Sequence, residues 1–347
     1  MSFAQYITNV FSDKTLAITS LLTLSVVFVN GWTDAPNAIA TCVSTRVLKV
    51  RPAIAMATVC NLIGVTVVTA LNSRVAHTIY NIADFSGNSD MALTALCAAM
   101  AAIVIWAVAA WYFGIPTSES HALISGITGA AVALNGGFSG ISISEWSKVI
   151  FGLLLSSVLG FVSGYIVLKT VVNIFLNISK NKSERFFKSA QIFSAASMAL
   201  MHGAQDGQKF IGVFLLGVTL AEGRTQQEFT IPMWLTVLCA AVMGIGTSTG
   251  GRKIIKSVGM DMVKLQSYQG FCADAAAAFC LLISTLTGLP VSTTHTKTTA
   301  IMGVGAAKRM SSVNWSVVKE MIYAWLLTFP GCGIIGYLTA KLFIGIF

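Results

Sequence analysis

The sequence contains few charged residues. Of its 347 residues only 10% are Asp, Glu, Lys or Arg, whereas 55% are hydrophobic and the mean hydropathy is +0.77. Soluble domains carry about 25% charged residues, so this composition excludes an ordinary soluble protein. Several stretches continue without charge for about 20 residues, the length of helix that crosses a bilayer core of roughly 30 Å. We therefore expect an all-α polytopic membrane protein.

Cysteine and histidine are too scattered to form a metal site. No two of the seven cysteines form a CxxC pair, and the four histidines lie far apart. All the cysteines lie in apolar segments, and we interpret them as buried small hydrophobic residues. A GxxxxGK[ST] loop is missing, which argues against direct use of ATP. The N-terminal stretch also lacks the features of a cleavable signal peptide, so none is expected.

Two motifs occur twice in the same order. GWTDAPNAIA and HGAQDGQKFIG share G-x-x-D, and their aspartates, Asp34 and Asp206, lie 172 residues apart. Two P-x-S-x-[ST]-H tracts begin at Pro116 and Pro290, which lie 174 residues apart. Because different motifs recur at almost the same spacing, we infer an internal duplication.

The charge of the loops reverses between the two copies. Loop 46–51 holds three basic residues, whereas its counterpart 218–228 holds two glutamates and one arginine. Loop 72–90 holds one arginine and two aspartates, whereas 252–264 holds four basic residues and one aspartate. Since positive loops face the cytoplasm, the two halves face opposite ways. We therefore expect an inverted repeat, as in many secondary transporters. The net charge of +9 then needs no nucleic acid partner.

The predicted organisation is a first repeat, 1–179, a basic cytoplasmic linker, 180–188, and a second repeat, 189–347. About five membrane elements per repeat place both termini outside a cytoplasmic membrane. The fourth element of each repeat is either a re-entrant hairpin or a broken helix at the midplane, and 75–85 and 252–260 are interfacial helices or loops. The predicted elements are 16–45, 52–71, 91–113, 116–135, 147–178, 190–220, 231–250, 265–288, 289–307 and 315–346.

The proline tracts are typical of an anion site. Pro116 and Pro290 suit the first turn of a helix. Hydroxyl and free N–H groups at a helix N-terminus bind anions, and inversion would bring two such termini to one point. The predicted ligands of a small tetrahedral oxyanion are Thr117, Ser118, Ser120, Ser292, Thr293 and Thr294.

The duplicated aspartates suit a coupled cation better than an anion. An ionisable residue inside a membrane segment is a functional candidate, although each aspartate could also cap a broken helix. We predict that Thr33, Asp34, Asn37 and Asp206 bind the coupling ion, H⁺ or Na⁺. For Na⁺, which takes oxygen ligands, the predicted site is Asp34, Asn37 and Asp206.

Lys209 breaks the symmetry of the repeats, since at the 172-residue spacing it stands opposite Asn37. Its ammonium could pair with Asp206, contact the anion, or fill the space of a cation. The last role would favour coupling to H⁺ over coupling to Na⁺.

Five further polar residues are candidates for supporting roles. Glu119 is predicted either as a proton carrier or as a residue at the mouth of a cavity. Asp274 has either a gating or proton-linked role or a buried hydrogen-bonding role. His121 and His295 either ligate the anion or brace the broken helices, and bracing is favoured. His202 is interpreted as a packing or hydrogen-bonding residue.

The four motifs resemble those of the PiT-type inorganic phosphate transporters. The duplicated family signature G-x-N-D-x-x-N-A is similar to GWTDAPNA at 31–38 and GAQDGQKF at 203–210, and the P-x-S-x-[ST]-H tracts match at 116–121 and 290–295. The resemblance covers nearly the whole chain. It implies a homodimeric symporter that holds phosphate between the signature helices and the tracts. We place Gln205 and Lys209 among the predicted phosphate contacts.

Departures from the signature leave the coupling ion and the anion open. Thr33 and Gln205 stand where Asn is frequent, and Lys209 replaces the second signature Asn. The Gln-Lys pair resembles bacterial members, some of them similar to proton-coupled carriers of a metal–phosphate complex, whereas other members are sodium-coupled. Related proteins carry sulfate. Besides phosphate and membrane lipid, a cytoplasmic accessory protein could bind at 180–188.

Two other classes of function are disfavoured. An intramembrane enzyme would need one asymmetric nucleophile and base, whereas the motif residues occur in duplicate. A passive anion channel needs no paired broken helices at the midplane. We expect no enzymatic activity and no cofactor other than the coupling ion.

Overall fold

The computed structural model describes residues 2–85, 89–113, 117–223, 229–249, 255, 258 and 262–346. Within these ranges the regular structure is helical, with only two isolated β-bridges, so the predicted all-α class is confirmed. Pro116, most of the interfacial stretch 252–260, and several predicted loop charges lie outside the described residues; these charges are Arg224, Glu228, Arg252, Lys253, Lys256 and Asp261.

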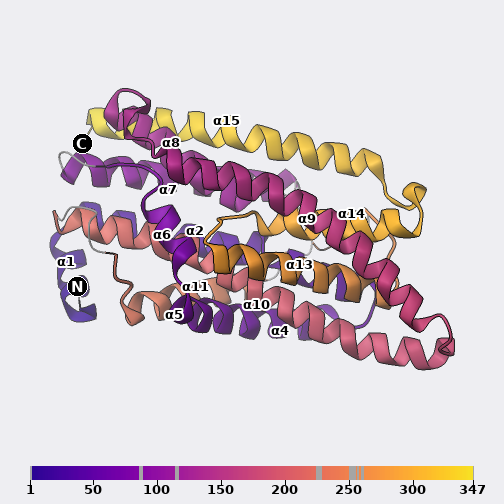
Figure 1. Cartoon of the computed structure of the whole chain (residues 1–347). Helices are drawn as coiled ribbons and strands as arrows, with labels where there is room; N and C mark the ends of the chain where they lie inside the picture. The colour runs from indigo at the N-terminus through magenta and orange to yellow at the C-terminus, as the bar shows by residue number, and fades with distance from the viewer. Residues whose placement is uncertain are drawn as a thin grey trace.

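The first half of the chain forms a series of helices that run between the two ends of the molecule (Figure 1). Six described helices are long and apolar enough to cross a membrane, and four of them belong to this half. The elements are α1 (Phe3–Ser12), α2 (Lys14–Thr33), α3 (Pro36–Ser44), α4 (Val50–Ile63), the π-helical η1 (Gly64–Val68), α5 (Thr69–Leu71), α6 (Arg74–Tyr80), α7 (Ser89–Phe113), α8 (Glu119–Asn135), η2 (Phe138–Gly140) and α9 (Ile143–Phe175).

The second half has a similar order of helices. It comprises α10 (Lys180–Ala221), α11 (Met233–Thr249), α13 (Ser267–Thr287), α14 (Thr293–Lys308), η4 (Met310–Ser312) and α15 (Trp315–Ile346). Residues 180–188, predicted as a linker, are the first turns of α10, and only a short turn separates them from α9. We name the end of the molecule at this turn the linker face; both chain termini lie at the opposite end, the terminus face (Figure 1).

The two proline tracts lead into helices of 17 and 16 residues, each shorter than the helix before it, and each returns along that helix. Asn135, at the end of α8, donates to the carbonyl oxygen of Asp84, which lies just before α7. Likewise Val313, shortly after α14, forms a β-bridge with Val263, just before α13. The pairs α7–α8 and α13–α14 are therefore helical hairpins. Outside the hairpins, each half has three further membrane elements: α2–α3, α4–α5 and α9 in the first half, and α10, α11 and α15 in the second. An odd number of crossings makes the second half start on the opposite side of the membrane, so the hairpins are compatible with the predicted inversion.

The first signature segment is interrupted and the second is not. Pro36 has no N–H, and the N–H of Asn37 bonds to the carbonyl of Asp34, three residues back instead of four. The carbonyl groups of Trp32 and Thr33 thereby lose their ordinary helical donors. In contrast, Asp206 lies inside the continuous α10, so an interrupted helix is found at only one of the two signature motifs.

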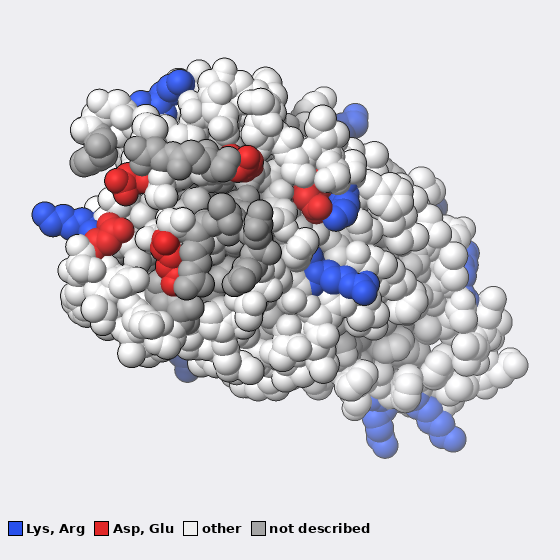
Figure 2. Space-filling view, turned by 60° about the vertical axis from the view of Figure 1, so that its left-hand side comes forward, with Lys and Arg blue, Asp and Glu red and all other residues white. Residues whose placement is uncertain are grey.

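The charged residues lie mainly near the two ends of the helices, and the terminus face also carries basic residues such as Lys14 and Lys148. Basic residues of the loop 46–51, the start of α10 and the end of α14 belong to the linker face. Acidic residues begin α7 and α9 at the other end. Figure 2, which brings the terminus face forward, shows acidic side chains gathered there.

Small residues let the hairpins approach their neighbours closely, as is usual between membrane helices. A Cβ atom at Gly303 of α14 would overlap the carbonyl oxygen of Phe161 on α9, and one at Gly129 of α8 would overlap that of Gly333 on α15. These close contacts hold α14 against α9 and α8 against α15.

We expect Gly303→Ala to lower the melting temperature of the detergent-solubilised protein by several degrees. The added methyl group pushes α14 away from α9, and overpacking of this kind costs about 1–3 kcal/mol. Gly345→Ala is the matched control, since among the described residues nothing lies within 4 Å of its added methyl group. Equal melting temperatures for the two variants would contradict the close contact.

Candidate functional site

Helices α8 and α14 begin with the same cap. Ser118 Oγ accepts a hydrogen bond from the N–H of His121 at 3.3 Å, and Ser292 Oγ accepts one from the N–H of His295 at 3.2 Å. Serine in an extended conformation is favoured at this position because its hydroxyl satisfies a free N–H of the first turn. Both predicted phosphate ligands therefore serve as caps, and each keeps a hydroxyl proton to donate.

The N-termini of α8 and α14 meet inside the molecule. The rings of His121 and His295 contact edge to face, with centroids 4.4 Å apart. His121 also stacks on Phe329, and His295 lies against Trp325, both of α15. The imidazoles hold this junction by ring packing. Their predicted hydrogen bonds or contacts with the anion stay predictions.

Asp34 lies at the interruption between α2 and α3. Its carboxylate accepts hydrogen bonds from Asn37 Nδ2 at 2.5 Å, from Thr293 Oγ1 at 3.2 Å, and from the hydroxyl of Thr294. Asp34 and Asn37 are each 2% exposed, and the two threonines are as deeply buried. All three hydrogen-bond partners are electrically neutral.

Asp206 has a different set of partners. Lys209 Nζ lies 2.6 Å from its Oδ1, and His202 Nε2 lies 3.2 Å from its Oδ2. Asn30 Nδ2 donates to the same Oδ2 at 3.4 Å, and Thr293 Oγ1 lies 3.0 Å from it, so its single proton can turn to either aspartate. Thr293 therefore links the two aspartates, and Asp206, unlike Asp34, is directly paired with a buried ammonium.

Lys209 is wholly enclosed by its partners. It is 0% exposed, and besides Asp206 it donates to Ser120 Oγ at 2.6 Å and to the carbonyl oxygen of Val291 at 2.5 Å. Of the roles predicted for it, pairing with Asp206 is present. Through Ser120 and Val291 the ammonium also connects α10 to both tracts.

Three of the remaining predicted residues, Glu119, Gln205 and Thr117, have other partners or surroundings. Glu119 is 3% exposed and accepts a hydrogen bond from Thr33 Oγ1 at 3.2 Å, so it lies inside the site and not at a cavity mouth. Gln205 is tied at both ends of its amide, to the carbonyl oxygen of Leu289 at 2.7 Å and to Thr285 Oγ1 at 2.9 Å. Thr117 is half-buried just before α8.

Asp274 does not join this centre. It pairs with Lys297 of α14 and accepts hydrogen bonds from Thr41 of α3, one turn beyond Asn37. The structure thus brings most of the predicted residues together and places Asp274 in a second polar cluster. Lys297 was not among the residues singled out from the sequence, although a lysine within the predicted apolar element 289–307 is a visible signal.

Asn30 was not singled out from the sequence, and His202 was interpreted only as a packing or hydrogen-bonding residue, yet both contact Asp206. They lie 172 residues apart, at the spacing of Asp34 and Asp206, so the repeat itself could have indicated them. His202 Nδ1 lies 3.2 Å from Asn61 Oδ1, which fixes the imidazole against α4. Its predicted hydrogen-bonding role fits these contacts.

The site contains groups that suit a small cation and groups that suit an anion. Asp34, His202 and Asp206 each offer one ligand atom, and these atoms lie within 4.8 Å of one another. Among the described residues, Asn37 Oδ1 is buried without a hydrogen-bond partner. Together with Asp34 and the carbonyl groups freed at the interruption, it provides oxygen ligands of the kind that Na⁺ takes. Hydroxyl groups from both tracts provide donors for an oxyanion.

We expect Lys209→Met to lower the stability of the protein by about 3–5 kcal/mol, because it leaves the buried Asp206 without its ammonium. The double variant Asp206→Asn/Lys209→Met removes both charges and should regain most of the loss. Thermal unfolding in detergent measures both variants without depending on transport. A single variant as stable as the unmodified protein would contradict the importance of this pair.

Comparisons with known proteins cover nearly the whole chain. Residues 30–336 match the family described as "Phosphate transporter family". The chain is 38% identical over 321 residues to a "Probable low-affinity inorganic phosphate transporter" of Bacillus subtilis (strain 168), covering 92% of this chain and 95% of that protein. A protein of the same description from Rhizobium meliloti (strain 1021) is 36% identical, covering 94% and 97%.

A solved structure has a similar fold. The structure described as "The sodium-dependent phosphate transporter" superimposes with a TM-score of 0.88, covers 96% of this chain and 100% of its own, and is 22% identical in sequence. These matches confirm the family indicated by the four motifs and the expectation that the chain is not an enzyme. The chain belongs to the phosphate transporter family.

Proposed function

We propose that the chain imports inorganic phosphate across the cytoplasmic membrane by symport with a cation that binds at Asp34. The curated relatives at 36–38% identity are named as phosphate transporters. The observation that best supports coupling to a cation is the charge of the site. The centre holds three buried carboxylates, those of Asp34, Glu119 and Asp206, and one ammonium, that of Lys209. The imidazole of His202 lies beside Asp206.

This charge imbalance links the anion to a cation. Uncompensated charges are costly in a low-dielectric interior, and a phosphate anion adds negative charge beside carboxylates. The anion binds well only when protons or sodium ions neutralise those carboxylates. A cation bound at Asp34 therefore raises the affinity for phosphate, and by linkage phosphate raises the affinity for the cation by the same factor.

The two aspartates of the site have different roles. Asp206 keeps the fixed ammonium of Lys209, whereas the partners of Asp34 are neutral. The exchangeable cation accordingly belongs to Asp34, and Lys209 takes the place that a second cation would have by symmetry. Because the ammonium of Lys209 fills the space of one cation, we favour coupling to H⁺ over coupling to Na⁺.

Sodium is the second candidate for the coupled ion. The buried Asn37 Oδ1, which has no partner among the described residues, and the carbonyl groups of Trp32 and Thr33 favour it. These are hard oxygen ligands beside a carboxylate, and a proton on Asp34 would leave the amide oxygen unsatisfied.

Phosphate is favoured over sulfate by the carboxylates. Near neutral pH phosphate carries a hydroxyl group that donates a hydrogen bond, and sulfate has none, so a site with carboxylate acceptors discriminates between them. A metal–phosphate complex is a second candidate cargo. It is supported by the cluster of Asp34, His202 and Asp206, because carboxylate and imidazole ligands suit divalent metals.

The proposed orientation of the chain in the membrane rests on the distribution of charge. We place the linker face, with its basic residues, in the cytoplasm and both termini outside. We also propose that the chain forms a homodimer and that a cytoplasmic accessory protein binds at 180–188.

Uptake of labelled phosphate into proteoliposomes tests the coupling. With Na⁺ and H⁺ gradients imposed separately, we expect accumulation to follow the pH gradient, to saturate with phosphate, and to be lost in Asp34→Asn. Asp13→Asn is the matched control, because Asp13 caps α2 at the surface and asparagine caps equally well. Accumulation that needs Na⁺ and ignores the pH gradient would refute proton coupling. Flux that does not follow either gradient would indicate a channel.

The identity of the cargo is tested in the same vesicles. A large excess of sulfate should leave phosphate uptake unchanged, because sulfate lacks the hydroxyl donor. Removal of divalent metals with a chelator should also leave it unchanged. Inhibition by sulfate would argue against the role of the carboxylates in selectivity, and loss of uptake on chelation would favour the metal–phosphate complex.

A further inference from the structure

One side of α3 carries a polar residue at every turn from the central site outward. Asn37, Thr41 and Thr45 are spaced by four residues, so they lie in one line along the helix, which rises about 12 Å over this length. Asn37 Nδ2 donates to Thr294 Oγ1 at 3.0 Å in the central site. Thr45, at the other end, lines a cavity of about 620 Å³ at the linker face. The line of polar residues connects the two.

Halfway along this line lies a cluster of three buried polar residues, Thr41, Asp274 and Lys297, which we name the inner cluster. Thr41 Oγ1 lies 2.7 and 2.8 Å from the two carboxylate oxygens of Asp274. Lys297 Nζ pairs with the same carboxylate and lies 3.3 Å from Thr41 Oγ1. All three residues are 0% exposed. The cluster is one helical turn from the central site, since Lys297 follows Thr294 on α14 and Thr41 follows Asn37 on α3.

The cavity beyond the inner cluster suits an anion. Its wall includes Lys180, Lys188 and Glu184 of α10, of which Lys188 and Glu184 pair at 3.2 Å. Lys180 leaves the wall with one positive charge in excess, and Gln266 and Ser267 at the start of α13 add polar groups. Thr45 also donates to Gln191 Oε1 at 3.0 Å, and among the described residues the buried Nε2 of Gln191 has no hydrogen-bond partner. An unused donor therefore belongs to a residue that contacts Thr45, which lines the cavity.

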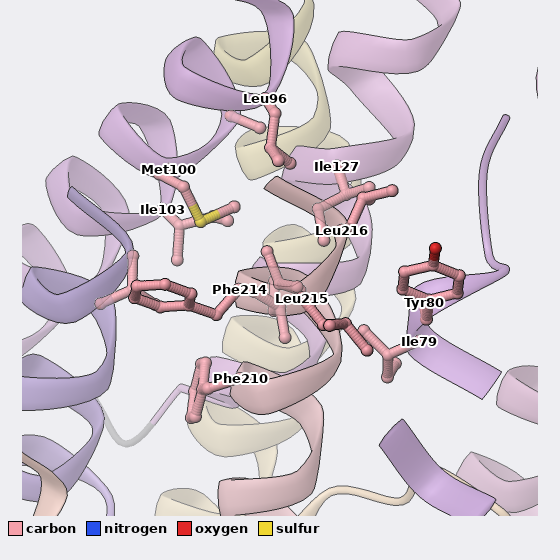
Figure 3. Close-up of a cluster of buried hydrophobic side chains, with 14 of the residues drawn as sticks. Ile79, Tyr80, Leu96, Met100, Ile103, Ile127, Phe210, Phe214, Leu215 and Leu216 are labelled. Atoms are coloured by element: carbon pink, nitrogen blue, oxygen red, sulfur yellow. The ribbon is translucent and has the colours of Figure 1, made fainter. Parts of the chain in front are cut away.

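The corresponding region on the other side of the central site is apolar. At the repeat spacings the counterparts of Thr41, Lys297 and Asp274 are Val213, Leu123 and Met100, which are 0–1% exposed and belong to the main hydrophobic core. Figure 3 shows Met100 in this core, near Phe214 and Leu216 of α10. Since the first repeat packs these positions with hydrophobic residues, packing alone does not require an ion pair in the second.

We propose that the inner cluster is a second, transient phosphate site and the gate between the central site and the linker face. The proposal rests on phosphate being the transported anion. In the closed state Asp274 holds Lys297 across the path. When phosphate arrives, its oxygens accept hydrogen bonds from Lys297 and Thr41, and its hydroxyl group donates to Asp274.

The chemistry of the cluster suits a hydroxyl-bearing oxyanion. Lysine binds phosphate as a point charge on a flexible stem, so its ammonium can turn from the carboxylate to the anion. Asp274 and Lys297 together are neutral, and therefore the anion does not meet a net negative barrier. Sulfate, which has no donor for Asp274, would be held less well at the gate.

The test replaces the inner cluster with the residues of the first repeat. The double variant Asp274→Met/Lys297→Leu is compared with the unmodified protein and with Lys148→Gln, a matched control that removes a lysine from a pair with Glu145 on α9. Two quantities are measured, the affinity for inorganic phosphate in detergent by titration calorimetry and the initial rate of uptake into proteoliposomes. Melting temperatures establish that each variant is folded.

We expect the double variant to keep its phosphate affinity within about twofold while its uptake rate falls about tenfold or more, a loss of roughly 1.4 kcal/mol in the rate-limiting step. Lys148→Gln should match the unmodified protein. A folded double variant with unchanged uptake would overturn the proposal, since the ion pair would then be only structural.

Thr41→Val decides the question if the double variant does not fold, because it removes a single hydroxyl. We expect its uptake rate to fall and its phosphate affinity to hold, and an unchanged rate would overturn the proposal. Failure of the proposed function is distinguishable, because in that case the unmodified protein itself would neither bind nor accumulate phosphate.

Discussion

The structure depends on the need to compensate buried carboxylates inside a membrane. Asp34, Glu119 and Asp206 have almost no exposure to solvent, so their charge must be balanced by neighbouring groups or by bound ions. The head-to-head hairpins provide the neighbours. Thr293 and Thr294 of α14 and Ser120 of α8 reach the aspartates or Lys209, and the paired imidazoles of His121 and His295 hold the two helix ends together. The stability of the charged centre therefore depends on the correct packing of the hairpins.

The two halves inferred from the repeated motifs differ at single positions. Lys209 makes the Asp206 half a fixed ion pair, while Asn37 leaves the Asp34 half with neutral partners. The same contrast recurs one turn away from the centre. The inner cluster of Thr41, Asp274 and Lys297 is polar, whereas its counterparts in the first repeat are hydrophobic. Identical halves would bind ions identically and could not distinguish one side of the membrane from the other.

Much of the central site was predictable because it is built from repeated motifs. Asp34, Asp206, Ser120, Thr293 and Thr294 were identified from the G-x-x-D and P-x-S-x-[ST]-H patterns, and the structure brings them together. The individual contacts were not predictable. Gln205, whose predicted contact with the anion stays a prediction, bonds to Leu289 and Thr285, and Glu119 lies beside Thr33. Amide and carboxylate side chains bind whichever partner the packing brings within reach. The distance between two side chains from different segments cannot be read from a sequence motif.

The sequence by itself determined the class of protein, the duplication and the residue types of the site, because hydropathy and motif spacing are properties of the chain alone. Only the tertiary structure decided that α8 and α14 are arms of hairpins, that α10 is continuous at Asp206, and that Lys297 joins Asp274. These features depend on contacts between segments far apart in the chain. The close approach of helices at glycine and the pairing of charges across the interior fix them, and both arise only when the helices pack.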